Sequence, residues 1–282
     1  MIFFIFITPT FPLNLPPINV YDNVLPPSIS STLYPQTDLP TSQTRFVFSR
    51  SSPLKTPLEI TLNNLLTQLN DTSPYVEYWS RSTWNNLEIH RDVDEILAKN
   101  KPKEDFKFPI NGHVLYLNCT GPSISKNSGQ TFLFHSSKMY TIPPLSSRLL
   151  RFRGDVLHGV PRPSLSYYDE MVGGTNHKIY TRRRGDQEKR EVVLFNTWGY
   201  EVEGERDEDS GGEGKFTVNC FEDWIFRDVV EEKGGEELRL KVPLLGDLKR
   251  RGNVNRFVEL KVKSEMVLED DSPRSYDIIG EI

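Results

Sequence analysis

The stretch His113-Val114-Leu115-Tyr116-Leu117 is a short apolar run that lies between turn residues. Pro109-Ile110-Asn111-Gly112 precedes it, and Gly121-Pro122 follows it shortly afterwards. A short run of apolar and aromatic residues bounded by turn formers is typical of a β-strand. Five further stretches of this kind are Tyr75–Trp79, Leu87–Ile89, Thr131–Phe134, Arg148–Phe152 and Val192–Phe195. Many short strands with turns between them predict an antiparallel sandwich or a jelly-roll barrel.

A helix is predicted before the first of these strands. Thr56 and Glu59 have the spacing of a capping box, and Pro57 stands at the first helical position, where its missing N–H costs nothing. Apolar residues then recur at helical spacing at Leu58, Leu62, Leu65, Leu66 and Leu69. Because this apolar stripe must pack on another element, the predicted fold is mainly β with supporting helices.

The composition argues against two classes of protein. The chain has 282 residues, with 34 Lys+Arg against 39 Asp+Glu and a net charge of -5. A protein that binds duplex nucleic acid presents a concentrated basic surface to the phosphates, so we expect no nucleic-acid partner. No stretch approaches the roughly 18 apolar residues that a membrane-spanning helix needs, so we expect no membrane span.

The cellular compartment stays open. The two cysteines, Cys119 and Cys220, are too few for a disulfide framework and form no CxxC pair, so we interpret them as small buried thiols. The segment Met1–Ile7 resembles the apolar part of a signal peptide, but no Lys or Arg precedes it and Pro9 follows it. A soluble cytoplasmic protein is favoured slightly over a secreted one.

Proline content divides the chain. Eight of the 20 prolines fall within the first 40 residues, so we predict an extended leader over residues 1–45 with one strand-like segment at Ile18–Tyr21. Residues 46–270 form the predicted domain, with its core at 75–200, and residues 271–282 form a tail. The alternating stretches Leu238–Val242 and Phe257–Val262 are expected to close an outer edge of the sheet.

Two histidines and one aspartate have the pattern of a metal site. In His90-Arg91-Asp92 the imidazole and the carboxylate point to the same face of a strand. Together with His158 they offer two imidazoles and one carboxylate, which on one face of a metal leave the opposite face open. This is the ligand set of a non-haem Fe(II) site that activates oxygen. An H-x-D triplet alone is weak evidence, because a surface ion pair explains it more often.

The order of the surrounding segments resembles the Fe(II)/2-oxoglutarate-dependent dioxygenases, specifically the branch related to prolyl 4-hydroxylases. In that family the H-x-D motif is followed by a V-L-Y-L-N strand, a G-x-T loop and strand, a proline-containing turn, a G-R-L-L-x-F-like strand, the distal histidine and a basic residue on a late strand. The matching segments here are Val114–Asn118, Ser128–Phe132, Pro143-Pro144, Ser147–Phe152, His158–Pro161 and Arg190–Phe195. The resemblance covers about residues 75–198.

The resemblance implies a double-stranded β-helix, or jelly-roll, core and a role for particular residues. His90, Asp92 and His158 would hold Fe(II), to which 2-oxoglutarate and O2 would also bind. Arg190 would bind the distal carboxylate of 2-oxoglutarate, and Tyr116 could hydrogen-bond this cosubstrate, although a tyrosine of the core is the commoner role. The implied reaction hydroxylates an unidentified peptidyl or small-molecule substrate and converts 2-oxoglutarate to succinate and CO2, with ascorbate as an optional addition.

One spacing departs from the family pattern. Arg190 lies 32 positions after His158, further than the cosubstrate-binding base of the family, and this requires an insertion over residues 164–189. Lys189 and Arg162 are therefore alternatives for the role of Arg190. We prefer Arg190 because it directly precedes an apolar strand, as the base of the family does.

Other residues and functions are weighed beside this one. Asp94 has the same parity as Asp92 and is expected either to support the site from outside or to be solvated, and His113 is expected to be an ordinary polar residue at a strand end. The main alternative function is a catalytically inactive jelly-roll binding module, in which the three ligands fail to converge or Arg190 points away from the cavity. A cupin-like metal enzyme without 2-oxoglutarate would lack a basic residue beside the metal.

Overall fold

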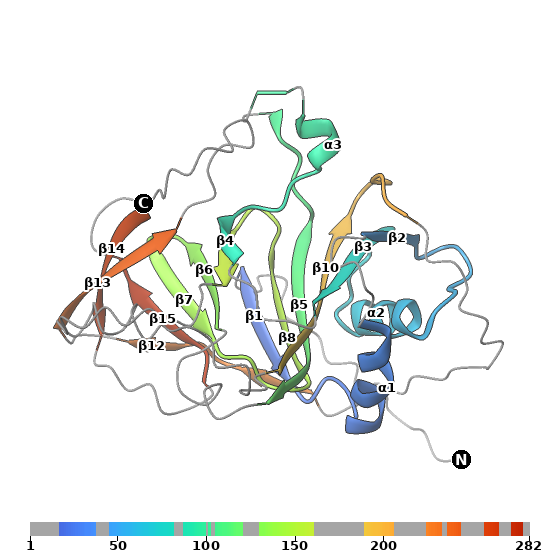
Figure 1. Ribbon diagram of the computed structural model, residues 1–282, viewed down its shortest axis with the longest axis horizontal. Helices are drawn as coiled ribbons and strands as arrows, with labels where there is room; N and C mark the ends of the chain where they lie inside the picture. Colours follow the sequence, from blue (N-terminus) through green and yellow to red (C-terminus); the bar gives the residue numbers. More distant parts are fainter. Residues whose placement is uncertain are drawn as a thin grey trace, which may run out of the picture.

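The computed structural model describes residues 17–37, 45–81, 87–99, 101–102, 105–120, 130–160, 189–205, 224–232, 236–243, 257–264 and 272–278. Most of the regular structure in these residues is β-strand, in two large sheets with helices beside one of them (Figure 1).

The larger sheet has seven strands in the order β11-β1-β8-β5-β10-β3-β2, and all its neighbours pair antiparallel. Its strands are β1 (Ile18–Asp22), β2 (Phe46–Ser49), β3 (Tyr75–Arg81), β5 (Asn111–Thr120), β8 (Arg148–Arg153), β10 (Lys189–Trp198) and β11 (Ile225–Arg227). The long strands β5 and β10 lie near its centre.

The smaller sheet has six strands in the order β12-β15-β7-β6-β9-β4. Its strands are β4 (Leu87–His90), β6 (Thr131–His135), β7 (Lys138–Ile142), β9 (Leu157–Val160), β12 (Val230–Glu232) and β15 (Arg274–Asp277). Only the β12–β15 pair of this sheet is parallel among the described strands. The strand β4 therefore stands at one edge, next to β9.

The eight consecutive strands from β3 to β10 form the jelly-roll core. The strands β3, β5, β8 and β10 lie in the larger sheet, whereas β4, β6, β7 and β9 lie in the smaller one. The chain thus passes repeatedly from one sheet to the other, and strands distant in sequence become neighbours. This is the double-stranded β-helix expected from the sequence, so the predicted fold class is confirmed.

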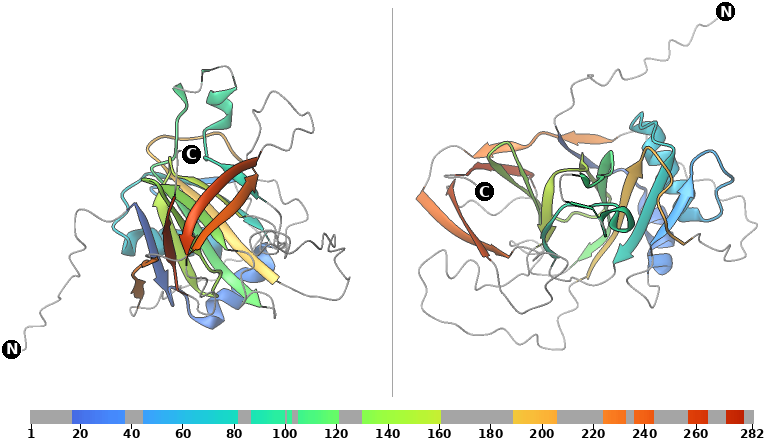
Figure 2. Two further views of the ribbon diagram at one scale, coloured as in Figure 1. Left: turned by 90° about the vertical axis from the view of Figure 1, so that its left-hand side faces the viewer. Right: turned by 90° about the horizontal axis from the view of Figure 1, so that it is seen from above.

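Apolar side chains pack on both faces of the larger sheet. Along β5, Val114 and Tyr116 belong to the core between the two sheets, while Leu115 and Leu117 belong to the core beneath the helices. The helices α1 (Pro27–Thr37) and α2 (Pro57–Gln68) cover that outer face (Figure 2). The molecule is therefore layered as helices, larger sheet and smaller sheet, with the inner core between the sheets.

The helix α2 begins as the sequence predicts. Thr56 is its N-cap, and its Oγ1 accepts a hydrogen bond from the Glu59 backbone N–H at 3.1 Å. The Glu59 carboxylate accepts from the Lys55 backbone N–H at 2.5 Å, one residue before the cap, where a capping box has the cap itself. The remaining described helix is the short α3 (Glu95–Ala98). None of the helices in the described residues has the length and apolar character that crossing a membrane requires.

The proline-rich leader differs from the extended segment expected. All of β1 is buried between β8 and β11, and residues Pro27–Thr37 form α1. Asp22 at the end of β1 makes a buried two-pronged ion pair with Arg148, with Nε–Oδ1 at 2.6 Å and Nη2–Oδ2 at 3.1 Å. Residues 17–37 are thus part of the packed domain, while residues 1–16 and 38–44 lie outside the described residues.

The C-terminal strands also differ from the expectation. The strands β13 (Glu236–Pro243) and β14 (Phe257–Ser264) form a two-stranded sheet of their own, at the end of the molecule away from α1 and α2 (Figures 1 and 2). The expectation that these two strands close an outer edge of the sheet was therefore wrong. Instead β15, which lies in the predicted tail, pairs with β7. Of the predicted insertion 164–189, only the Lys189 backbone lies in the described residues.

Candidate functional site

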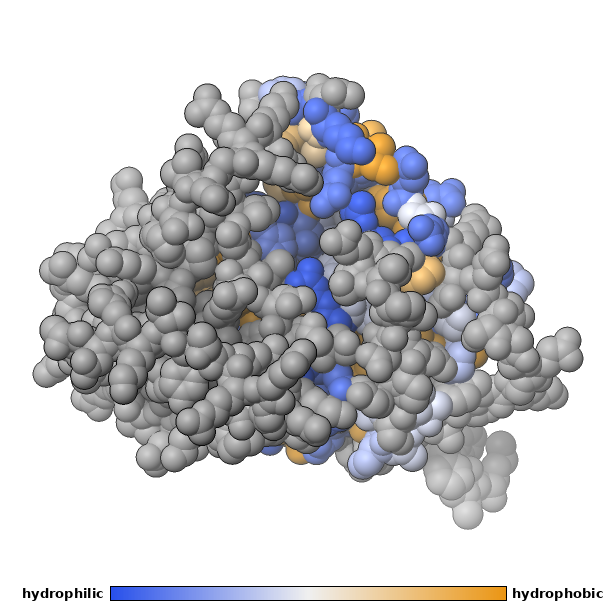
Figure 3. Space-filling model, in the orientation of Figure 1, coloured by the Kyte–Doolittle hydropathy of each residue, from blue (hydrophilic) through white to orange (hydrophobic). Residues whose placement is uncertain are grey.

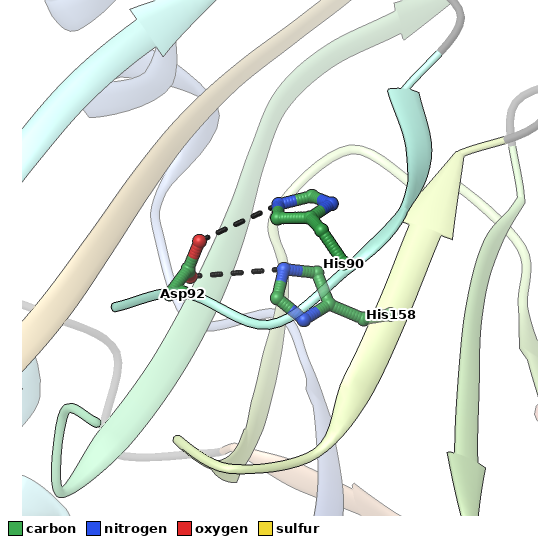
Figure 4. A group of neighbouring side chains, drawn as sticks. All are labelled: His90, Asp92 and His158. Atoms are coloured by element: carbon green, nitrogen blue, oxygen red, sulfur yellow. Dashed lines mark ion pairs between the residues drawn. The ribbon is translucent and has the colours of Figure 1, made fainter. Parts of the chain in front are cut away.

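The structure brings His90, Asp92 and His158 together. His90 is the last residue of β4, and His158 lies directly opposite it on β9. Asp92 follows β4 by two residues. One ligand atom of each side chain lies within 4.8 Å of the others, and the three side chains point toward one another (Figure 4).

Each oxygen of the Asp92 carboxylate faces one imidazole. The distance from His90 Nε2 to Asp92 Oδ1 is 3.4 Å, and that from His158 Nε2 to Asp92 Oδ2 is 3.6 Å. The centroids of the two imidazole rings lie 4.5 Å apart with an angle of 52° between the rings. The donor atoms therefore form one compact cluster at the edge of the smaller sheet.

The tautomer of His158 suits a metal ligand. Its Nδ1 lies 3.0 Å from the backbone oxygen of Val156, and because a carbonyl oxygen only accepts, Nδ1 carries the proton. Burial lowers the pKa of His158, an effect that Asp92 opposes and His90 reinforces. The ring is therefore neutral and turns the lone pair of Nε2 toward the Asp92 carboxylate. Two acceptors facing each other in the interior are satisfied by a cation, so this donor set fits a metal ion.

The Asp92 carboxyl is ionised at neutral pH. Burial alone would raise its pKa, but His158, His90 and a hydrogen bond from the Asn196 side chain lower it to about 2. Asn196 is buried on β10 and also hydrogen-bonds Glu77, which lies directly opposite it on β3. The Asp92 carboxylate thus carries a full negative charge, and the hydrogen bond from Asn196 helps to fix its position.

Glu77 in turn is held from two sides. Trp198 Nε1 donates to its Oε2 at 3.1 Å, and Arg45 Nη1 lies 3.4 Å from its Oε1. Burial raises the pKa of Glu77 to about 7, with Arg45 opposing this rise and Asp92 adding to it. Asn196, which is itself hydrogen-bonded to Glu77, therefore positions the Asp92 carboxylate.

Phe152 supports the other side of the cluster. The centroid of its ring lies 4.8 Å from that of His158. Gly112, directly opposite Phe152 on β5, makes room for this ring, because a Cβ at position 112 would come within 2.7 Å of it. A glycine at this position leaves space for the aromatic ring that contacts His158.

Arg190 lies on the inner face of β10 with two hydroxyls beside it. Its side chain is buried, and Nη2 donates to Thr131 Oγ1 at 3.2 Å. The guanidinium carbon lies 5.3 Å from the centroid of the Tyr116 ring, and the Tyr116 hydroxyl is 2.6 Å from Thr131 Oγ1. Burial raises the pKa of Tyr116, although Arg190 opposes this, so the phenol stays protonated. A guanidinium with hydroxyl donors fits a carboxylate.

The two geometric signs of an inactive binding module are absent from the described residues. The three ligands converge, and the Arg190 side chain lies in the interior rather than pointing away from it. Of the alternatives to Arg190, the Lys189 side chain and Arg162 lie outside the described residues.

The space-filling view shows hydrophilic side chains in a hollow below α3, over β4 and β5 (Figure 3).

Asp94 has a different role from those expected. Its Oδ1 accepts hydrogen bonds from the backbone N–H groups of Ile96 and Leu97, at 3.2 and 3.0 Å, and so caps α3. Its Oδ2 accepts from the Tyr200 hydroxyl at 3.2 Å. Asp94 is therefore neither solvated nor a partner of the three ligands.

His113 is also not an ordinary strand-end residue. It is buried on the helix-covered face of β5, and its ring stacks on Phe195 with centroids 4.3 Å apart and an angle of 2°. Its Nδ1 lies 3.2 Å from the Phe195 backbone oxygen. The expectation failed because strand alternation turns this residue toward the helices rather than to solvent.

Comparisons with known proteins give only distant similarities. No family model and no curated protein matches the sequence. Solved structures similar to this chain include a prolyl-4-hydroxylase from Pseudomonas putida, with 13% identity, coverage of 64% of this chain and 86% of that chain, and a TM-score of 0.42. HygX from Streptomyces hygroscopicus with iron bound has 11% identity, coverage of 72% and 92%, and a TM-score of 0.38. A prolyl hydroxylase from Trichoplax adhaerens, in complex with a hypoxia inducible factor peptide fragment, has 14% identity, coverage of 65% and 84%, and a TM-score of 0.37.

Proposed function

We propose that this protein is an Fe(II)- and 2-oxoglutarate-dependent dioxygenase that hydroxylates a peptidyl or small-molecule substrate. The observation that carries the proposal is the meeting of His90, Asp92 and His158, whose ligand atoms lie within 4.8 Å of one another. Two imidazoles and one carboxylate on one side of a metal suit Fe(II) and leave positions for further ligands.

The residues around the three ligands prepare them for Fe(II). The Val156 carbonyl fixes the proton of His158 on Nδ1, and the Phe152 ring limits its rotation. Asn196 holds the ionised Asp92 carboxylate. Fe(II), bound with 2-oxoglutarate and O2, supplies the oxidising chemistry that converts 2-oxoglutarate to succinate and CO2 and hydroxylates a C–H bond. The chain contributes ligands held in place before the metal binds.

The second anchor of the proposal is Arg190. Its guanidinium would bind the distal carboxylate of 2-oxoglutarate, and one hydroxyl of the hydrogen-bonded pair Thr131 and Tyr116 would be a further donor. Because Arg190 and Tyr116 are almost fully buried, water competes little and the charge–charge attraction is stronger than at the surface. If Thr131 supplies the hydrogen of the bond between the two hydroxyls, Tyr116 would donate to the cosubstrate as well as pack in the core.

The test is succinate formation from 2-oxoglutarate, measured with and without Fe(II) and ascorbate. We expect succinate that requires Fe(II) and disappears in His158→Ala. The matched control is His135→Ala, because His135 ends β6 and is not among the three ligands. Calorimetric titration with Mn(II) provides a second readout, which does not need the primary substrate. Equal metal binding and succinate formation by the wild type and His158→Ala would rule the proposal out.

A further inference from the structure

The inner face of β3 carries an arginine that the proposed reaction does not use. Arg81 is the last residue of β3 and pairs directly with Val192 on β10. Trp79, two residues earlier, packs against the core between the sheets, whereas Tyr78 packs in the core beneath the helices. Since side chains alternate along a strand, Arg81 shares the inner face with Trp79.

Arg81 lies near both parts of the proposed site. Its guanidinium interacts electrostatically with Asp92, one of the three ligands, and with Arg190. Arg190 precedes Val192 by two residues on β10 and so lies on the same face of the sheet as Arg81. Two guanidiniums on neighbouring strands therefore face the interior beside the metal ligands.

Arg81 has no partner at hydrogen-bonding or ion-pair distance in the described residues, although the charge of Asp92 acts on it from further away. The side chain is partly buried, and the described part of the chain gives it no hydrogen bond and no ion pair. Two other arginines that are withdrawn from solvent each pair with an aspartate, Arg148 with Asp22 and Arg151 with Asp71. Burying a charge without a partner is costly, so an unpaired guanidinium here indicates a missing anion.

The residues and ligands already assigned do not supply this anion. In the described residues Asp92 is the carboxylate whose charge acts on Arg81, and a divalent metal held by the three ligands would take up that charge. Glu77 also lies on the inner face of β3, but it is paired with Arg45. Arg81 thus remains as an additional positive charge once the metal and the cosubstrate are in place.

We propose that Arg81 binds a carboxylate inside the site, in addition to the distal carboxylate that Arg190 holds. This inference rests on the proposed function. A planar guanidinium matches the two oxygens of a carboxylate. The carboxylate comes either from the metal-side end of the 2-oxo acid or from the primary substrate, which would then be an organic acid or carry an acidic side chain.

The first measurement tests the 2-oxo acid. The Mn(II)-loaded protein is titrated calorimetrically with 2-oxoglutarate and with 2-oxobutyrate, which lacks the distal carboxylate. Arg190→Met is expected to weaken the binding of 2-oxoglutarate and to leave the binding of 2-oxobutyrate unchanged. If Arg81 holds the metal-side carboxylate, Arg81→Met lowers the affinity for both acids by about tenfold or more, which is the effect of losing a charge-assisted hydrogen bond.

The second measurement tests a separate carboxylate. The protein saturated with Mn(II) and 2-oxoglutarate is titrated with acetate and with benzoate as probes. Saturable binding to the wild type that Arg81→Met weakens by about tenfold or more assigns Arg81 to the primary substrate. The inference is overturned if Arg81→Met matches the wild type toward both 2-oxo acids and toward both probes.

Three further variants keep the outcome interpretable. Arg81→Lys keeps the charge and should recover part of the lost affinity, and Arg81→Gln replaces Arg81→Met if the latter unfolds. Arg153→Met is the matched control, because Arg153 is exposed on β8 and pairs with Asp155. A wild type that binds neither Mn(II) nor 2-oxoglutarate contradicts the proposed function itself. A wild type that binds both, with Arg81→Met unchanged, contradicts only the role of Arg81.

Discussion

Two buried histidines, His158 and His113, lie on the two sides of the larger sheet, each with an aspartate near it. Both direct Nδ1 at a backbone oxygen, that of Val156 at 3.0 Å and that of Phe195 at 3.2 Å. Burial lowers the pKa of both histidines, so both rings are neutral at pH 7 and carry the lone pair on Nε2. By residue type and burial alone, the two sites look alike.

The two aspartates differ in their partners. Asp71, near His113, accepts hydrogen bonds from the Ser73 backbone N–H at 2.9 Å, from Asn111 Nδ2 at 2.9 Å and from Arg151 Nη2 at 3.0 Å. Asp92 also accepts a hydrogen bond, from the Asn196 side chain, but its Oδ2 faces the lone pair of His158. A carboxylate surrounded by donors stabilises the fold as it stands, whereas one that faces an acceptor needs a cation. The type of partner, not burial, separates the structural cluster from the candidate metal centre.

The largest expected effect tests this distinction directly. His158→Ala should abolish Mn(II) binding, because it removes one of three ligands, while His113→Ala should leave Mn(II) affinity unchanged in the folded protein. Calorimetric titration of the folded variants measures both. Comparable loss of Mn(II) affinity in the two variants would show that the two histidines are not different in kind.

The second expectation concerns stability without metal. Asp71→Ala leaves the partly buried guanidinium of Arg151 unpaired and should lower the free energy of unfolding by about 3 kcal/mol. Asp92→Ala removes the hydrogen bond from Asn196 but also an acceptor that faces the lone pair of His158, so in the metal-free protein it should lower the free energy of unfolding by less than Asp71→Ala does. Urea unfolding in the presence of a chelator compares the two, and an equal loss in both would contradict the assignment.

A third expectation concerns the side-chain amides that hydrogen-bond the two carboxylates, Asn196 at Asp92 and Asn111 at Asp71. Asn196→Ala should weaken Mn(II) binding by about tenfold, because a hydrogen-bonding partner of a metal ligand sets its orientation. Asn111→Ala removes the corresponding amide from Asp71 and should change stability without changing Mn(II) affinity. An unchanged Mn(II) affinity in Asn196→Ala would mean that Asn196 does not position Asp92.

The smallest expectation is a dependence on pH from the outer cluster. Burial and Arg151 lower the pKa of His113 to about 3, although Asp71 opposes them. An unfolded histidine has a pKa of about 6.5, so between these values the unfolded state binds a proton that the folded state does not. The free energy of unfolding therefore falls on acidification from about pH 6.5, by at most about 1.4 kcal/mol per pH unit.

The variant His113→Phe isolates this contribution, because a phenyl ring can still stack on Phe195 and does not titrate. Urea unfolding is measured at several pH values between neutrality and about pH 4. As the pH falls, the free energy of unfolding should decrease more for the wild type than for the variant. Parallel stability curves would show that His113 titrates alike in both states.

Most strands of the jelly-roll core were predictable, since turn residues separate them in sequence, whereas their order within the two sheets was not predicted. The exceptions have physical causes. β7 follows a turn in which Ser136 and Ser137 have φ of 50° and 60°, a hairpin conformation that glycine and asparagine signal but serine does not. α1 begins with Pro27, which is compatible with a first helical turn, and packing of Leu33 in the core outweighs the proline content of the segment.

The ligands were easier to predict than their neighbours. His90 and Asp92 are two residues apart, so the alternation of a strand predicted that they meet, although β4 ends at His90 and Asp92 lies just beyond it. The pairs that bring Glu77 opposite Asn196 and Arg81 opposite Val192 join distant strands, and their register depends on how the whole sheet assembles. Alternation along β10 does place Asn196 on the face of Arg190, and that signal was available from sequence.

The strand β1 has a consequence for how the chain folds. Val20 pairs with Leu150 on one side and with Arg227 on the other, and Asp22 binds the guanidiniums of Arg148 and Arg227. During synthesis, one flank of β1 stays open until residues 225–227 have left the ribosome. Contacts between such distant segments close long loops, so the last step of assembly should be slow, and the nascent chain must keep an apolar strand from aggregating until its partners arrive.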